Sequence, residues 1–89
     1  MHVSNMKRDN GNVIPNQFII EDDEGNLFFQ SYDVVVAKIQ AKGEWAWLDR
    51  DKWNYSPTTA RYRNQFLRLT TKETEQKIAS GEIILIDLN

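Results

Sequence analysis

The apolar residues of this chain come in short runs, and none of them is long enough to cross a lipid bilayer. Two of the longest are VVVA at residues 34–37 and IILI at residues 83–86, whereas a membrane helix needs about 20 apolar residues. In a chain of 89 residues, such runs can supply only short strands and one-sided helices around one small core. The sequence therefore predicts a single α+β domain.

Three segments have the pattern of strands. NQFIIEDDEGNLFFQS (16–31) predicts a β-hairpin, with Gly25 in its turn at a positive φ. EWAWLD (44–49) predicts a strand with Trp45 and Trp47 on one face. EIILIDL (82–88) predicts a strand whose nearly continuous apolar run indicates burial on both faces.

Three further segments have helix signals. In SYDVVVAKIQAKG (31–43), Ser31 resembles an N-cap and Gly43 a stop, although the three valines leave a strand as the alternative. In residues 56–69, Ser56 is the predicted N-cap and Pro57 the first helical residue. Residues 70–81 start with the spacing of a capping box and end at a glycine.

The predicted order of elements is β-β-α-β-α-α-β, with an antiparallel or mixed sheet packed against the helices. The domain is predicted over residues 14–89. Residues 1–13, MHVSNMKRDNGNV, are polar and are predicted to form a flexible N-terminal arm.

Histidine and cysteine, which many enzymes use as bases, nucleophiles and metal ligands, are nearly absent. The only histidine is His2, and there is no cysteine, so Ser-His and Cys-His nucleophiles are disfavoured. The acidic run at 21–24 does not fit an EF-hand, because a loop aligned on Gly25 would start at Ile20 and end at Ser31. We therefore expect a non-enzyme without metal or cofactor, and the absence of cysteines and of a signal peptide favours the cytoplasm.

Positive charge is concentrated in the middle of the chain. Residues 44–72 carry six Lys/Arg and three Asp/Glu, a net charge of +3, whereas residues 1–43 sum to −2 and residues 73–89 to −3. On the predicted helix at 57–69, one face carries Tyr62, Phe66 and Leu69, which we expect in the core. The candidate binding residues are Arg61, Arg63, Gln65, Arg68, Lys72, Arg50, Lys52, Trp45, Trp47, Trp53 and Tyr55.

Three interpretations of these residues remain open. Arginine, tryptophan and tyrosine are enriched at the centre of protein interfaces, which favours a protein partner. The same arginines could meet nucleic-acid phosphates while exposed rings stack on bases. The third interpretation is a solvated helix face without a binding role. Separately from these residues, a homodimer through the strand at 82–88 is a further option.

The stretch WNYSPTTARYRNQFL (53–67) also carries a family resemblance. Its pattern W-x-Y-S-x-T-T-x-x-Y-R-N-x-F-L resembles an uncharacterised family of short proteins from phages and mobile elements of Gram-positive bacteria. Two more pieces are similar to that family, IPNQFII…EG…FQSY before the stretch and TKETEQKI-SGE after it, so the resemblance covers most of residues 14–83.

The resemblance implies an accessory protein of a phage-like genome that works in the host cytoplasm. Small proteins of that origin often bind host machinery or host defence complexes, and this step is an analogy. Our leading expectation is therefore a non-catalytic protein that binds a host protein and inhibits or redirects it. A nucleic-acid-binding accessory protein using the helix at 57–69 is the alternative.

Overall fold

The computed structural model describes residues 1–43 and 46–89, and it confirms the α+β class. Six strands and two helices follow one another, and from β5 onward the order of elements agrees with the prediction. The elements are β1 (His2–Lys7), β2 (Val13–Glu21), β3 (Leu27–Ser31), β4 (Val34–Ile39), β5 (Ala46–Asp49), α1 (Pro57–Leu67), α2 (Thr71–Ser80) and β6 (Ile83–Ile86).

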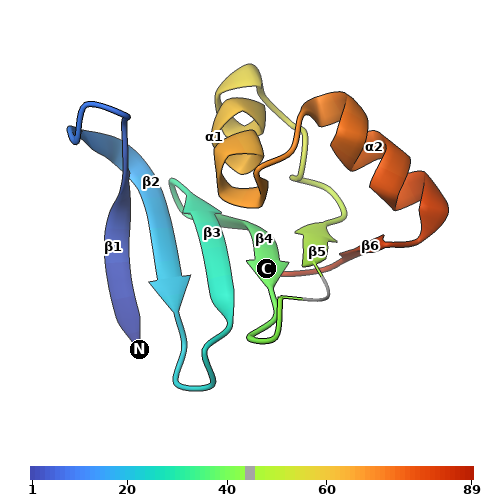
Figure 1. The fold of residues 1–89 in the computed structure, drawn as a ribbon, viewed down its shortest axis with the longest axis horizontal. Coiled ribbons are helices and arrows are strands. Elements are labelled where there is room, and N and C mark those ends of the chain that lie inside the picture. The colour runs from blue at the N-terminus through green and yellow to red at the C-terminus, as the bar shows by residue number, and fades with distance from the viewer. Residues whose placement is uncertain (44–45) are drawn as a thin grey trace.

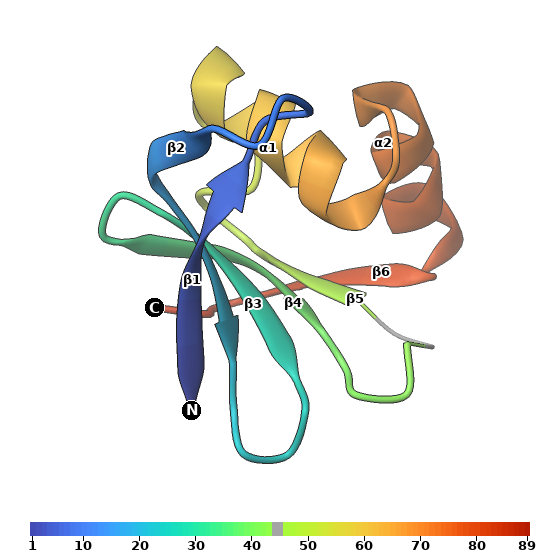
Figure 2. The same ribbon diagram turned by 60° about the vertical axis from the view of Figure 1, so that its left-hand side comes forward.

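The six strands form one mixed sheet whose spatial order equals their order in the chain. Neighbours are antiparallel from β1 to β5, and β6 then runs parallel to β5 after the two helices. Both helices lie on the same side of this sheet (Figures 1 and 2). The sheet therefore has a covered face and an open face, on which no helix of the described chain lies.

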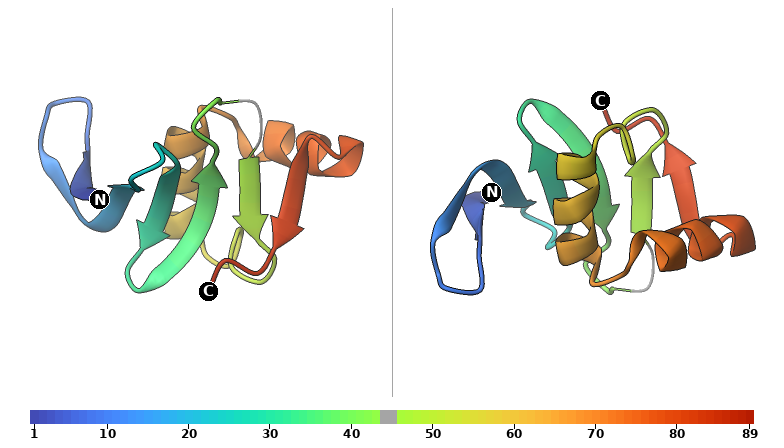
Figure 3. Two further views of the ribbon diagram at one scale, coloured as in Figure 1. Left: turned by 90° about the horizontal axis from the view of Figure 1, so that it is seen from below. Right: turned by 90° about the horizontal axis from the view of Figure 1, so that it is seen from above.

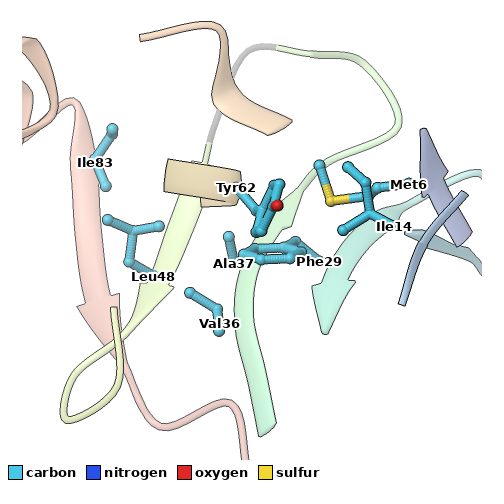
Figure 4. Packing of buried hydrophobic residues seen from close by; sticks show 8 residues of the cluster. All are labelled: Met6, Ile14, Phe29, Val36, Ala37, Leu48, Tyr62 and Ile83. Atoms are coloured by element: carbon cyan, nitrogen blue, oxygen red, sulfur yellow. The ribbon is translucent and has the colours of Figure 1, made fainter. Parts of the chain in front are cut away.

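The core lies between the covered face and α1. Phe29 of β3 is completely buried, and its ring centre is 5.8 Å from that of Phe66 on α1. Tyr62 of the same helix lies beside Phe29 (Figure 4), and its side chain is buried. The prediction that Tyr62, Phe66 and Leu69 feed the core is confirmed, because the last two also pack against the buried cluster.

The predicted hairpin at 16–31 is confirmed as β2 and β3. Gly25 has a φ of 86° in the turn, a conformation that costs glycine little because it has no Cβ. The side chain of Asp22 accepts hydrogen bonds from the main-chain N–H groups of Glu24 and Asn26. The hydrogen bond from the Asn26 side chain is the main reason that the pKa of Asp22 lies below its ordinary value.

The predicted helix at 31–43 is wrong, since residues 34–39 form strand β4. Ser31 ends β3, and Tyr32 and Asp33 make the tight turn between the two strands. The valines at 34–36 belong to the β-branched type that favours strands. A bulge in the pairing of β3 with β4 breaks the strict alternation of faces, so Val36 and Ala37 are both completely buried.

The predicted flexible arm contains a strand instead. Residues His2–Lys7 form β1, which pairs antiparallel with β2. A single buried apolar residue, Met6, packs with Ile14 of β2 (Figure 4). The pairing shifts between Asn5 and Lys7, and most of the strand is exposed because β1 lies at an edge of the sheet. This exposure explains why its composition resembles a loop.

The prediction that the strand at 82–88 is buried on both faces is also wrong. Strand β6 lies at the other edge of the sheet. Ile83 points into the core and is 4% exposed, whereas Ile84 lies on the open face and is 43% exposed.

Both C-terminal helices have the predicted capping residues. The hydroxyl of Ser56 accepts a hydrogen bond from the N–H of Thr59, and Pro57 is the first residue of α1. Thr70 and Glu73 form the predicted capping box of α2, and Gly81 ends that helix. No helix in the described ranges combines the length and the hydropathy that crossing a bilayer requires.

The C-terminal tail is held to the sheet by two polar side chains. The carboxylate of Asp49, which is buried at the end of β5, accepts hydrogen bonds from the main-chain N–H groups of Lys52 (3.0 Å) and Leu88 (2.9 Å). The amide of Asn89 bonds to the N–H (2.8 Å) and the carbonyl (2.9 Å) of Val35 in β4. The tail thereby takes up the main-chain hydrogen bonds of Val35, in the part of β4 that does not pair with β5.

We expect Asp49→Asn to lower the free energy of unfolding by about 1–3 kcal/mol at neutral pH, because one acceptor oxygen becomes a donor. Burial of Asp49 alone would raise its pKa. The hydrogen bonds from Leu88, Asn89, Asp51 and Lys52 together outweigh the effect of burial and lower the pKa. The charged carboxylate therefore stabilises the fold above about pH 4, and this contribution is lost as the pH falls through the folded pKa.

Urea unfolding at several pH values tests this expectation. The difference between the natural chain and Asp49→Asn should shrink below about pH 4. Asp51→Asn, at an exposed position two residues away, is the matched control and should change stability by less than about 0.5 kcal/mol. A difference between Asp49→Asn and the natural chain that is constant with pH would contradict the assignment.

Candidate functional site

The inner side of α1 carries an arginine among its core residues. Thr59, Tyr62 and Phe66 follow helical spacing on the side that faces the sheet, and Arg63 falls within the same stripe. The side chain of Arg63 is 0% exposed, and it is the largest fully buried side chain of the described residues. Arg63 therefore cannot reach a partner, and its prediction as a contact residue is wrong.

The guanidinium group of Arg63 joins the loop before α1 to the first residue of α2. Its Nη1 donates to the carbonyl of Trp53 (2.7 Å) and to Oδ1 of Asn54 (3.0 Å). Its Nη2 donates to Oδ1 of Asn64 and to Oγ1 of Thr71, both at 2.9 Å. The Cζ atom lies 5.0 Å from the ring centre of Trp53. Four polar contacts and the Trp53 ring thus replace much of the water that a charged side chain would otherwise need, while Nε is buried without a hydrogen-bond partner.

Burial lowers the pKa of Arg63, and the charge of Glu75 acts in the opposite direction. Trp53 is half-buried with Arg63 over its ring, so most of the stretch at 53–67 builds the scaffold. Thr59 likewise lies inside, within hydrogen-bond distance of Ser31 on β3 (3.3 Å).

The outer side of α1 and its C-cap carry three exposed polar side chains. Arg61 and Gln65 of α1 and the C-cap residue Arg68 are exposed, and Gln65 donates from its side chain to the carbonyl of Lys7 in β1 (3.0 Å). A hollow of about 310 Å³ lies on one side of Gln65, where Arg8 and Arg61 line it. A second hollow of about 320 Å³ lies on the other side, between Lys7 and Arg68. We call Lys7, Arg8, Arg61, Gln65 and Arg68 the basic cluster.

The cations of the basic cluster are not neutralised by the carboxylates that the structure describes. Among the described residues, ion pairs within 4.0 Å join only the N-terminal amine to Asp23 and Lys77 to Glu82. Asp9 is the single acidic residue that lines either hollow. Arg61 lies 5.6 Å from the ring centre of Tyr62, which leaves its charge available. A positive surface of at least four charges therefore remains.

The other predicted basic residues lie apart from this cluster. Arg50, Lys52 and Lys72 are exposed, and none of them lines either hollow. The ammonium of Lys52 lies 5.3 Å from the ring centre of Tyr55, which is 45% exposed.

Trp47 lies on the open face of the sheet, away from the arginines of α1. Its neighbour Leu48 is completely buried in the core, and successive side chains of a strand point to opposite faces. Trp45 lies outside the described residues, so its predicted shared face with Trp47 stays a prediction. Trp47 therefore lies on a different surface from Arg61 and Arg68.

The pairing of the strands places Trp47 in a row that crosses the whole open face. Each residue of this row is the direct partner of the next: Val3 of Ile20, Ile20 of Phe28, Phe28 of Lys38, Lys38 of Trp47, and Trp47 of Ile84. Five of the six are apolar. We call these six residues the cross-strand row.

Lys38 is the only charged member of the cross-strand row. Its ammonium lies 5.3 Å from the ring centre of Phe28 and 5.2 Å from that of Trp47, distances at which the negative faces of aromatic rings attract a cation. The two rings and the cation form a unit near the middle of the sheet. Val3 and Ile84 at its ends are 54% and 43% exposed, so the row is open to a partner.

A metal site is not formed by the acidic side chains that the structure describes. No group of three or more His, Cys, Asp or Glu side chains in the described ranges is arranged to hold an ion. In the acidic turn, Asp22 instead bonds to the main chain and side chain of Asn26.

A comparison with protein families places this chain in one of them. The sequence profile of a family of unknown function, DUF8033, matches residues 1–82. The chain belongs to DUF8033. No curated protein and no solved structure matches it, so no site residue can be carried over from a relative. The binding sites of this DUF8033 protein are therefore inferred from its own surfaces.

Seven residues of these two surfaces were not among the predicted binding residues. Lys7, Arg8 and Val3 fell in the predicted arm, and Lys38 in the predicted helix. Ile20 and Phe28 were assigned to the hairpin, and Ile84 to the strand at 82–88, without an individual role in binding. A signal for Phe28 was present, because two adjacent phenylalanines in a strand must point to opposite faces and Phe29 already fills the core.

Proposed function

We propose that this DUF8033 protein is a non-catalytic binding protein that docks a protein partner on the open face of its sheet. The cross-strand row carries this proposal, since five of its six side chains are apolar, with Lys38 between Phe28 and Trp47, on a face that no helix of the described chain covers. Exposed apolar surface of this kind is typical of protein interaction sites. The partner would present apolar side chains and a carboxylate that meets Lys38.

The finer proposal follows the family resemblance. We infer a phage-type accessory protein that binds a host protein in the host cytoplasm and inhibits or redirects it, with defence proteins as one class of target. Trp47 would be the main contact, because a large ring near the centre of an interface often contributes most of the binding energy.

Replacing Trp47 with alanine should weaken partner binding at least tenfold, since hot-spot truncations cost about 2 kcal/mol or more. The purified protein, immobilised and incubated with nuclease-treated host lysate, would capture the partner, and titration of that partner would give the affinities. Tyr55→Ala is the matched control, because Tyr55 is an exposed aromatic residue outside the cross-strand row. Equal loss in both variants, or no loss in Trp47→Ala, would reject the open face as the docking surface.

Nucleic-acid binding is the second candidate, and the unpaired charges of the basic cluster favour it. Phosphate contacts require cations and produce affinity that falls steeply with salt. The double variant Arg61→Ala, Arg68→Ala separates the two candidates. It should keep the protein partner if our proposal holds. The same capture is repeated with lysate that has not been treated with nuclease. Recovery of nucleic acid alone from that lysate, lost in this double variant, would replace the protein partner with the second candidate.

A further inference from the structure

The two edges of the sheet differ in how well they are protected against pairing with another chain. Edge strands of soluble proteins usually carry charged side chains, bulges or prolines that prevent such pairing. Strand β1 has a shifted register between Asn5 and Lys7 and is largely polar. Strand β6 consists of Ile83, Ile84, Leu85 and Ile86 in an unshifted register with β5. Its protection is limited to its short length and to the two carboxylates that flank it, Glu82 and Asp87.

The outer edge of β6 has free main-chain groups. The carbonyl of Ile86 accepts a hydrogen bond from the N–H of Arg50 (2.7 Å), so Ile86 directs its peptide groups toward β5. Because this direction alternates along a strand, Ile84 does the same, and Ile83 and Leu85 direct their N–H and carbonyl groups outward. No strand of the described chain lies beyond β6 to receive them (Figure 3).

We propose that a second copy of this chain pairs with β6 antiparallel, through a two-fold axis at Ile84. In this register, Ile83 of each copy faces Leu85 of the other, and their outward groups form about four hydrogen bonds. Ile84 of one copy lies opposite Ile84 of the second copy on the open face. This pairing is independent of the proposed host-protein interaction, although it adds to the surface available for it.

Charge favours this register. Glu82 and Asp87 flank β6, and Glu82 already bonds to Lys77 (2.9 Å). With Ile84 on the axis, Glu82 lies opposite Ile86 of the second copy and Asp87 lies opposite Gly81 of the second copy, so no two carboxylates face each other directly. Like charges directly opposite each other would destabilise a strand pair.

The cross-strand row continues through this interface. Because Ile84 is its last member, the second copy adds a second row in the same line, and the two apolar open faces become one. The two exposed Ile84 side chains then cover each other. Helix α2 lies near the start of β6 and extends past this edge of the sheet (Figure 3), so the two-fold axis places the α2 helices of the two copies at opposite ends of the new strand pair.

Sedimentation equilibrium of the full chain tests the pairing with two matched variants. The natural chain should approach twice the 10.4 kDa of one chain in a series up to about 1 mM, which covers weak specific contacts. Ile84→Lys should weaken association at least tenfold, because two ammonium groups would meet on the axis. Val3→Lys places the same charge on the exposed residue at the other end of the row and should leave association unchanged.

Each other outcome overturns the proposal. A natural chain that stays monomeric throughout the series excludes a second copy as the occupant of this edge. Association that survives Ile84→Lys, or that Val3→Lys weakens equally, assigns the contact to another surface. Circular dichroism would show that both variants are folded, which we expect because both positions are exposed.

Amide hydrogen exchange gives a second measurement on the natural chain. The N–H of Leu85 should exchange more slowly as the protein concentration rises, because it becomes hydrogen-bonded in the pair. In Ile84→Lys its exchange should not depend on concentration. A natural chain that doubles in mass while the exchange of Leu85 stays constant would place the contact elsewhere and overturn the proposal.

Discussion

Replacing Arg63 with alanine is expected to lower the free energy of unfolding by about 3–5 kcal/mol. The side chain is fully buried and donates to four acceptors. Alanine would leave the carbonyl of Trp53 and the hydroxyl of Thr71 without this donor and would open a space under the Trp53 ring. The loop before α1 and the first residue of α2 would then no longer be joined by the Arg63 side chain.

Urea unfolding of three variants checks this expectation. Arg61→Ala is the control on the same helix, and its exposed position predicts a change within about 0.5 kcal/mol. Arg63→Lys keeps the charge but loses the planar fork, so its stability should fall between those of the natural chain and Arg63→Ala. Equal stability of Arg63→Ala and Arg61→Ala would show that the buried hydrogen bonds do not hold the fold.

Replacing Phe29 with alanine should also cost about 3–5 kcal/mol, as is usual for a buried phenylalanine. Phe29 is 0% exposed, and its ring lies 5.8 Å from that of Phe66. Its removal would leave a cavity at the centre of the contact between β3 and α1. Loss of this contact would weaken the only layer of packing that the sheet has in the described chain.

Phe28→Ala is the matched control for Phe29→Ala. The two phenylalanines are neighbours on β3, but Phe28 lies on the open face beside Lys38. We expect Phe28→Ala to cost about 1 kcal/mol or less in thermal or urea unfolding, because only part of its ring is buried and one cation–π contact is lost. A larger loss of stability in Phe28→Ala than in Phe29→Ala would contradict the assignment of Phe28 to the open face and of Phe29 to the core.

Local capping chemistry predicted the C-terminal half of the fold well. Ser56 and Pro57 define the start of α1, and Thr70, Glu73 and Gly81 define both ends of α2. These residues satisfy main-chain groups within one turn of themselves. They therefore act the same way whatever the rest of the chain does, and a pattern read along the sequence is enough to find them.

The N-terminal half depended on contacts distant in sequence. Residues 31–43 carry a plausible cap and a plausible stop, yet β3 on one side and β5 on the other pair with residues 34–39 and make them a strand. Strand β1 contains a single buried residue, Met6. No local pattern in such a polar edge strand distinguishes it from a loop.

The candidate site was the least predictable part, because charge was taken as a sign of exposure. Arg63 falls in the stripe of Thr59, Tyr62 and Phe66, and this position was a sign of burial that its charge concealed. Lys7 and Arg8 join α1 only through the pairing of β1 with β2, which the sequence did not indicate.

The parallel placement of β6 has a consequence for the order of folding. Strands β1 to β5 pair with their neighbours in the chain, so each pairing closes a short loop, whereas the partners Ala46 and Ile83 are separated by 83 − 46 = 37 positions. Closing the longer loop costs more chain entropy, and non-local pairings form late for this reason. We expect a nascent chain to assemble the antiparallel meander first and to leave the edge of β5 without a partner strand until the two helices and β6 have followed.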